Sequence, residues 1–216
     1  MMSLNFKKRF YTSLVLLFFV FLIFNYKFFL TYFLIILGAM SILEFLQISK
    51  KIFKNKLTLI PINLFFIVFI FTFCMIFFFF SNIIGLKILL LVILFGCIGS
   101  DLGGFIFGKI FKGPKLTSIS PNKTYSGAIG SIIFATTIIS SLFFFLLNSF
   151  NLKIIIVGLM TSIFCQLGDL LFSFLKRKAK LKDTGNFLPG HGGILDRLDG
   201  ILIGVPFGLI SFILLI

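Results

Sequence analysis

The sequence predicts an all-α protein built from about seven membrane-spanning helices. Of its 216 residues, 59% are hydrophobic and only 12% are charged, and the mean hydropathy is +1.19. Soluble domains carry about 25% charged residues, so this shortage of charge indicates that most of the surface faces lipid. Long apolar runs recur along the whole chain, and the basic residues gather in alternate connections between them.

Seven apolar runs are candidates for these helices, because a helix needs roughly 20 apolar residues to cross a bilayer. They cover residues 10–24, 28–48, 57–80, 86–108, 128–147, 153–175 and 200–216. The first and last runs are short, and Pro206 predicts a kink in the last. We divide the chain into an N-terminal set of helices, 1–85, and a region that carries the motifs, 86–216.

The basic residues predict the orientation in the membrane. All but three of the 20 Lys and Arg residues fall at the N-terminus or in the second, fourth and sixth connections; the exceptions are Lys27, Lys87 and Lys153. Basic loops stay in the cytoplasm, so we expect a cytoplasmic N-terminus and an external C-terminus. In a soluble protein the net charge of +14 would suggest nucleic acid. Here topology accounts for the charge, and we expect no nucleic-acid partner.

The six acidic residues share the cytoplasmic half of the predicted topology. Three lie inside apolar helices and three in the last loop: Glu44, Asp101 and Asp169, then Asp183, Asp196 and Asp199. From the expected helix ends, Asp101 and Asp169 lie roughly 10 Å below the cytoplasmic surface. Acids inside a membrane need partners and mark functional sites. A packing carboxylate paired with a nearby lysine is the alternative, above all for Glu44.

The first motif lies in the connection 101–127. Ser120-Pro121 and Lys123-Thr124 stand just before a helix, where free backbone N–H groups can hold a phosphate. Lys123 would add a charge there and Thr124 a hydroxyl. The alternative is a plain helix cap. Three glycines at 103, 104 and 108 suit close packing of helices.

The second motif, 173–199, is much richer in charge and contains the single histidine, His191. Its glycines between 189 and 193 would let the backbone approach a ligand closely. Hard oxygen ligands suited to Mg²⁺ and cations suited to phosphate both occur in or beside it: Asp169, Asp183, Asp196 and Asp199, with Lys176, Arg177, Lys182 and Arg197. His191 would either donate to phosphate or form a structural hydrogen bond. Such a set, without a thiol or a Ser–His pair, favours metal-assisted phosphoryl or nucleotidyl transfer. Basic residues alone would only set orientation.

Residues 173–199 resemble the signature of the phosphatidate cytidylyltransferases, the CDP-diacylglycerol synthases. That pattern is S-x-x-K-R-x₄-K-D-x-[GSA]-x₂-[LIF]-P-x-H-G-G-x-x-D-R-x-D, and every fixed position matches. The resemblance extends upstream to Gly168-Asp169, to Asp101 and to the first motif. It covers roughly residues 95–216.

The resemblance implies a helical membrane enzyme that converts CTP and phosphatidate to CDP-diacylglycerol and diphosphate. It also implies a Mg²⁺ cofactor and leaves open a second, monovalent cation. The protein would be a homodimer in the cell (inner) membrane, with its active site facing the cytoplasm. Asp169 and Asp196 become the expected metal ligands, supported by Asp199. The full catalytic set is Asp169, Lys176, Arg177, Lys182, Asp183, His191, Asp196, Arg197 and Asp199. The substrate-binding set is Asp101, Ser120, Lys123, Thr124, Ser173, Gly192 and Gly193.

The chain departs from the family pattern in three ways. Ser126 stands where the family often has Glu, and Phe105 where Tyr is frequent. The chain is also short for the family, so we expect some N-terminal membrane segments to be missing. Two other functions stay open: a CTP-dependent enzyme acting on a polyprenol or isoprenoid phosphate, and a transporter in which Asp101 and Asp169 carry protons or cations. The unbroken signature and the lack of a visible internal repeat speak against transport.

Overall fold

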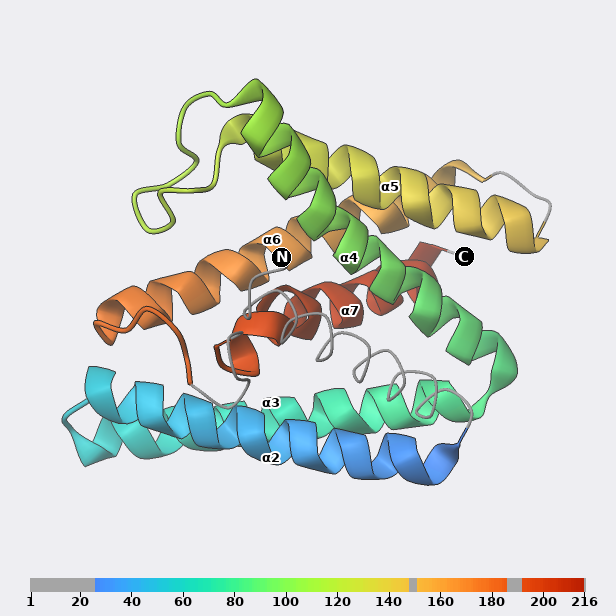
Figure 1. Ribbon diagram of the computed structural model, residues 1–216. Coiled ribbons are helices and arrows are strands. Elements are labelled where there is room, and N and C mark those ends of the chain that lie inside the picture. The colour runs from blue at the N-terminus through green and yellow to red at the C-terminus, as the bar shows by residue number, and fades with distance from the viewer. Residues whose placement is uncertain (1–25, 148–150, 186–191, 216) are drawn as a thin grey trace, which may run out of the picture.

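The computed structural model describes residues 26–147, 151–185 and 192–215, which form six long helices and no strand (Figure 1). They are α2 (Lys27–Ile52), α3 (Lys56–Asn82), α4 (Ile84–Phe111), α5 (Tyr125–Leu147), α6 (Leu152–Lys178) and α7 (Leu195–Leu215). Each is long and apolar enough to cross a membrane, with mean hydropathies from 2.0 to 2.8. The helical class and six of the seven expected helices are therefore confirmed. The expected helix at 10–24 lies outside the described residues.

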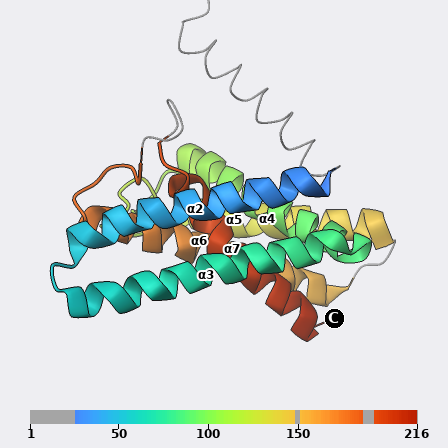
Figure 2. The same cartoon turned by 90° about the horizontal axis from the view of Figure 1, so that it is seen from below.

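The helices pack as a hairpin of α2 and α3 set against a group formed by α4 to α7 (Figures 1 and 2). Stacked rings of Phe45 and Phe66, 3.7 Å between centroids, join α2 to α3. An edge contact between Phe66 and Phe172 then joins α3 to α6. Aromatic packing thus connects the hairpin to the helix that carries Asp169.

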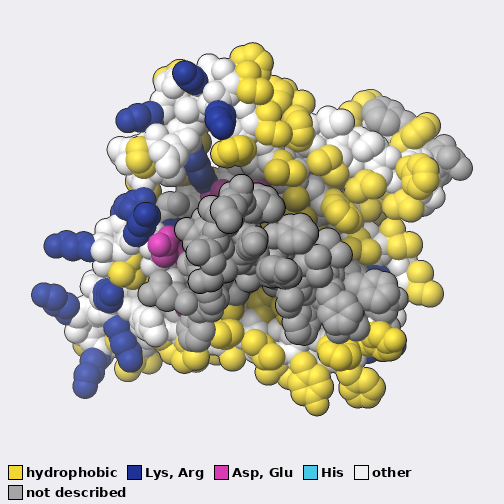
Figure 3. Space-filling model, in the orientation of Figure 1, with side chains coloured by type: hydrophobic (Ala, Val, Ile, Leu, Met, Phe, Trp, Pro, Cys, Tyr) yellow, Lys and Arg dark blue, Asp and Glu magenta, His cyan; other side chains and the backbone are white. Residues whose placement is uncertain are grey.

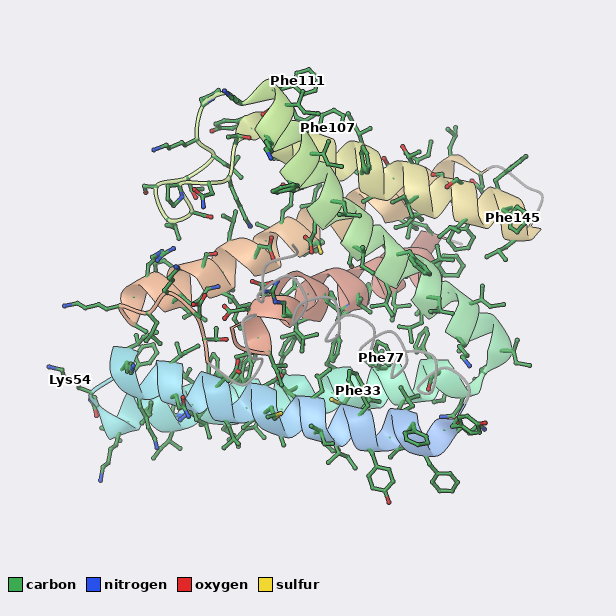
Figure 4. The ribbon with its side chains drawn as sticks, viewed as in Figure 1. Phe33, Lys54, Phe77, Phe107, Phe111 and Phe145 are labelled. Carbon is green, nitrogen blue, oxygen red and sulfur yellow. The ribbon has the colours of Figure 1, made fainter. Side chains whose placement is uncertain are left out.

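The charged connections gather at one end of the molecule. The α2–α3 turn, the α4–α5 connection and the end of α6 all lie on the left in Figure 1, and Figure 3 shows Lys and Arg side chains concentrated there. In Figure 4, Lys54 lies at this end and Phe145 at the opposite one. This arrangement agrees with the predicted alternation of charge. Which side faces the cytoplasm stays a prediction.

Two expectations about helix ends were wrong. Both α4 and α6 run three residues beyond their expected ends, so Asp101 lies ten residues before Phe111 and Asp169 nine before Lys178. At about 1.5 Å per residue, they lie about 14–15 Å from those ends, deeper than expected. Helix α7 begins at Leu195, five residues early. Asp196, Arg197 and Asp199 therefore belong to a helix and not to a loop.

Glycines allow the helices around the site to approach closely. A Cβ at Gly168 on α6 would collide with the backbone oxygen of Asp199 on α7, so only glycine permits this separation. Gly103 on α4 likewise packs against the backbone of Gly130 on α5. The predicted small-residue contact is thus confirmed at Gly103, and the α6–α7 contact sets Asp169 beside Asp199.

Candidate active site

Two lysine–aspartate ion pairs lie at the charged end. Lys123 Nζ is 2.9 Å from Asp169 Oδ2 and joins the α4–α5 connection to α6. Lys176 Nζ is 2.6 Å from Asp196 Oδ1 and joins α6 to α7. We call Lys123–Asp169 the open pair, because its side chains are 27% and 24% exposed. We call Lys176–Asp196 the closed pair, because its side chains are only 13% and 10% exposed. The structure thus pairs four of the predicted site residues across three elements.

The open pair lies in a pocket of about 170 Å³ between α4, α5 and α6. Three of the predicted site residues, Asp101, Lys123 and Asp169, line it. Gln166 also lines it and was missed by sequence reasoning. Its amide nitrogen lies 3.3 Å from both the carbonyl oxygen of Ala128 and the hydroxyl of Ser162. The available signal was its position one turn before Asp169 on α6.

Residues of the first motif mainly cap the N-terminus of α5 and close the connection before it. Thr124 Oγ1 accepts a hydrogen bond from the N–H of Gly127 at 3.1 Å, so its hydroxyl serves as a helix cap. Ser126, at the position where the family often has Glu, donates to the carbonyl oxygen of Lys112 and closes the connection. The carbonyl oxygen of Ser120 accepts the N–H of Lys123 at 3.0 Å. Of these residues, Lys123 is the one whose side chain reaches Asp169.

Acidic side chains from neighbouring helices surround Asp169. The charge of Asp169 on α6 acts on Asp199 of α7 and on Asp101 of α4, and a Cβ at Gly200, next to Asp199, would lie 3.2 Å from Asp169 Oδ1. Like charges this close repel unless positive charge lies nearby, and Lys123 supplies one such charge. Mg²⁺ typically binds through one or two carboxylates plus substrate phosphates and water. Asp169 with Asp199 fits this requirement. In the described ranges, no group of three or more His, Cys, Asp or Glu side chains offers a complete metal site.

The closed pair is held mainly by the protein itself. Asp196 Oδ2 accepts hydrogen bonds from the N–H of Thr184 at 2.7 Å and the N–H of Gly193 at 3.1 Å. The Thr184 hydroxyl lies 3.0 Å away and shares its one proton between Asp196 and Glu44. The other oxygen of Asp196 accepts from Lys176 at 2.6 Å. Gly192 has φ +83°, a conformation that glycine adopts readily. Here the glycines bring the backbone toward Asp196 and Thr184. The predicted metal roles of Asp169 and Asp196 both stay predictions, but the carboxylate of Asp196 is already occupied by the protein's own donors.

The remaining predicted residues lie around these pairs. Arg177, Lys182, Asp183 and Arg197 are exposed near the charged end. Ser173 is half-buried on α6, and its spacing from Asp169 and Lys176 sets all three on one face of that helix. His191 lies outside the described residues. Two residues that sequence reasoning did not select, Thr184 and Glu44, take part in the polar network beside Asp196.

The fold and site together define a helical protein of membrane-spanning character, with carboxylates and ammonium groups paired at one end of the helix bundle. Residues 62–215 match the model of the cytidylyltransferase family, and the chain belongs to that family. The resemblance seen in residues 173–199 is therefore confirmed.

Relatives named phosphatidate cytidylyltransferase come from several bacteria. The protein from Staphylococcus haemolyticus is 45% identical over 111 residues, which cover 50% of this chain and 42% of the relative. The one from Helicobacter pylori is 39% identical over 107 residues, covering 50% and 40%. The one from Rickettsia bellii is 39% identical over 126 residues, covering 54% of each chain. The match thus spans about half the length of these curated relatives.

Proposed function

We propose that this chain is a membrane nucleotidyltransferase that makes CDP-diacylglycerol and diphosphate from CTP and phosphatidate. The observation that carries the proposal is the complete signature at 173–199. It begins on α6, four residues after Asp169, and contains both residues of the closed pair, Lys176 and Asp196. Relatives that share about 40–45% identity with half of the chain bear the name of this activity.

In the proposed reaction, a phosphate oxygen of phosphatidate attacks the α-phosphorus of CTP. The bond from that phosphorus to the bridging oxygen of the β-phosphate breaks, and diphosphate leaves with the electron pair. Such transfers depend mainly on positioning and on neutralising phosphate charge. Lys123 is suited to this task, because its ammonium group can exchange from Asp169 to a phosphate oxygen in the pocket. Arg177 and Lys182, exposed near the charged end, are suited to the diphosphate.

Mg²⁺, when bound, would polarise a phosphate oxygen and neutralise part of its charge. Asp169 and Asp199 are the residues that would hold it, since α6 and α7 approach closely beside them at Gly168 and Gly200. A second, monovalent cation and a homodimer, both implied by the family, stay predictions.

The proposed location is the cell (inner) membrane, with the site open to the cytoplasm and the inner leaflet. Lipid phosphates lie at the bilayer surface, and the charged end of the bundle carries the cations that would meet them (Figure 3). Cysteines replacing the exposed residues Lys182 and Leu152 test this orientation. Lys182→Cys should react with an impermeant reagent only from the cytoplasmic side, and Leu152→Cys only from outside. The reverse pattern contradicts the orientation.

The direct test supplies purified protein with radiolabelled CTP, Mg²⁺ and either phosphatidate or a polyprenyl phosphate, and identifies the lipid product. We expect labelled CDP-diacylglycerol with phosphatidate, and loss of the product in EDTA. Turnover with the polyprenyl phosphate alone would favour the related enzyme on another lipid. No product with either lipid would overturn the proposal and leave transport as the alternative.

A further inference from the structure

Glu44 is a completely buried carboxylate in the middle of α2, with 0% exposure. The sequence left open whether it is a functional acid or a packing carboxylate paired with a nearby lysine. Its hydrogen-bond partners in the described structure are two backbone amides and a hydroxyl, and not a lysine. Oε1 accepts from the N–H of Ile194 at 2.9 Å, and Oε2 accepts from the N–H of Leu195 at 2.9 Å.

The third partner connects Glu44 to the closed ion pair. The hydroxyl of Thr184 lies 2.7 Å from Glu44 Oε2 and 3.0 Å from Asp196 Oδ2. Glu44 therefore contacts two separate parts of the last connection: Thr184 within it, and Ile194 and Leu195 where it joins α7. Because the N-terminus of a helix carries unsatisfied N–H groups and partial positive charge, a buried carboxylate there is well compensated.

Two glycines of the second motif pack directly against this carboxylate. A Cβ at Gly185 would lie 2.6 Å from Glu44 Oε1, and a Cβ at Gly193 would lie 2.6 Å from Glu44 Oε2. Both distances are too short for a real side chain. The backbone at both of these positions in the connection thus lies directly against Glu44.

Glu44 nevertheless lies outside residues 62–215, the part of the chain that matches the family model. We propose that Glu44 is a positioning residue for the active site: it anchors the Thr184 hydroxyl and the backbone of Ile194 and Leu195, and thereby holds Asp196 and Lys176 in place. It touches no reacting group itself. The effect on turnover rests on the proposed function, whereas the anchoring of the connection does not.

The test compares Glu44→Gln with Ser41→Ala in purified, folded protein. Gln keeps the size of the side chain but replaces one acceptor oxygen with a donor, so at least one partner loses its hydrogen bond. Ser41 is the matched control: it lies one turn earlier on α2, is equally buried, and its hydroxyl has no hydrogen-bond partner within the described ranges. Thr184→Val, which removes the bridging hydroxyl and keeps the shape, is a second variant if Glu44→Gln does not fold.

Two readouts are measured for each variant: backbone amide exchange in peptides covering 192–199, and kcat and KM for CTP with phosphatidate. For Glu44→Gln we expect exchange at Ile194 and Leu195 to be at least about tenfold faster. We expect kcat to fall at least about tenfold, because small misplacements of catalytic groups are costly, while KM changes little. Ser41→Ala should match the wild type in both readouts.

Unchanged exchange in Glu44→Gln overturns the anchoring, whatever happens to turnover. Faster exchange with unchanged kcat overturns the positioning role. If the wild type itself has no turnover, the proposed function fails, and the exchange measurement alone decides whether Glu44 anchors the connection.

Discussion

The two lysine–aspartate pairs have the same chemistry but different surroundings. Lys123–Asp169 is the more exposed, lies in a pocket, and has further carboxyl groups beside it. Lys176–Asp196 is shorter and less exposed, and its aspartate also accepts hydrogen bonds from two backbone amides, with the Thr184 hydroxyl shared between it and Glu44. Surface pairs exchange partners at little cost, whereas buried pairs are expensive to break. We infer that the open pair meets substrate and cation, and that the closed pair fixes the geometry around them.

The largest expected effect is the loss of activity in Asp169→Asn. The change removes the central charge of the open pair while nearly preserving its shape. Removal of one electrostatic group at such a site typically costs about 10²–10³-fold, so we expect at least about a 10²-fold fall in kcat for CDP-diacylglycerol formation. Activity within a few-fold of wild type would contradict the role of the open pair.

Asp196→Asn should have the next largest effect, through geometry. Asn keeps one acceptor but presents an NH₂ group to a cluster of donors, which disturbs the contacts of Lys176 and Thr184. We expect kcat to fall about 10–10²-fold, the scale of a misplaced catalytic group. Steady-state kinetics of the purified variant would check this, and a larger loss than in Asp169→Asn would reverse the assignment of the two pairs.

Lys123→Gln should weaken activity with little effect on folding. The side chain is partly exposed, and the loss of such an ion pair costs at most about 1 kcal/mol. We expect kcat/KM for CTP to fall about tenfold, since one phosphate partner is lost, with only a small change in unfolding temperature. A variant with normal kcat/KM would show that Lys123 only neutralises Asp169.

The smallest effects are expected for Lys178→Gln and Lys180→Gln. Lys178 Nζ lies 5.7 Å from the ring centres of Phe53 and Phe174, and Lys180 follows the end of α6. Neither occupies a fixed position of the signature. Turnover should stay within a few-fold of wild type, because the remaining basic residues still set the topology. Loss of activity comparable to that of Asp169→Asn would show that bulk charge, and not the pairs, controls the reaction.

Composition and charge pattern predicted six of the described helices because both are local properties of the sequence. The start of α7 was missed because the residues before it, Gly192 and Gly193, offer no capping side chain. Its amides at 194 and 195 bond instead to Glu44, 150 and 151 residues away in sequence. No spacing rule within the chain reveals a cap supplied from that distance.

The sequence predicted which residues belong to the candidate site, but not which of them form ion pairs with each other. The signature and its upstream extension selected Lys123, Lys176, Asp169 and Asp196 as site residues, yet they could not show which lysine meets which aspartate. That choice depends on close approach of α6 and α7 at Gly168 and on the fold of the α4–α5 connection. The different exposure of the two pairs is likewise a tertiary property.

The difference between the pairs is tested most directly by the thermal unfolding temperatures of Asp169→Asn and Asp196→Asn in the same detergent. Asp196→Asn removes the carboxylate partner of the poorly exposed Lys176 ammonium group. This loss lowers the free energy of unfolding by about 1–3 kcal/mol. We therefore predict that Asp196→Asn unfolds several degrees below the wild type, and that Asp169→Asn stays close to it or rises as the repulsion with Asp199 is relieved. Equal destabilisation of both variants, or a larger one in Asp169→Asn, would contradict the division between an open, functional pair and a closed, structural one.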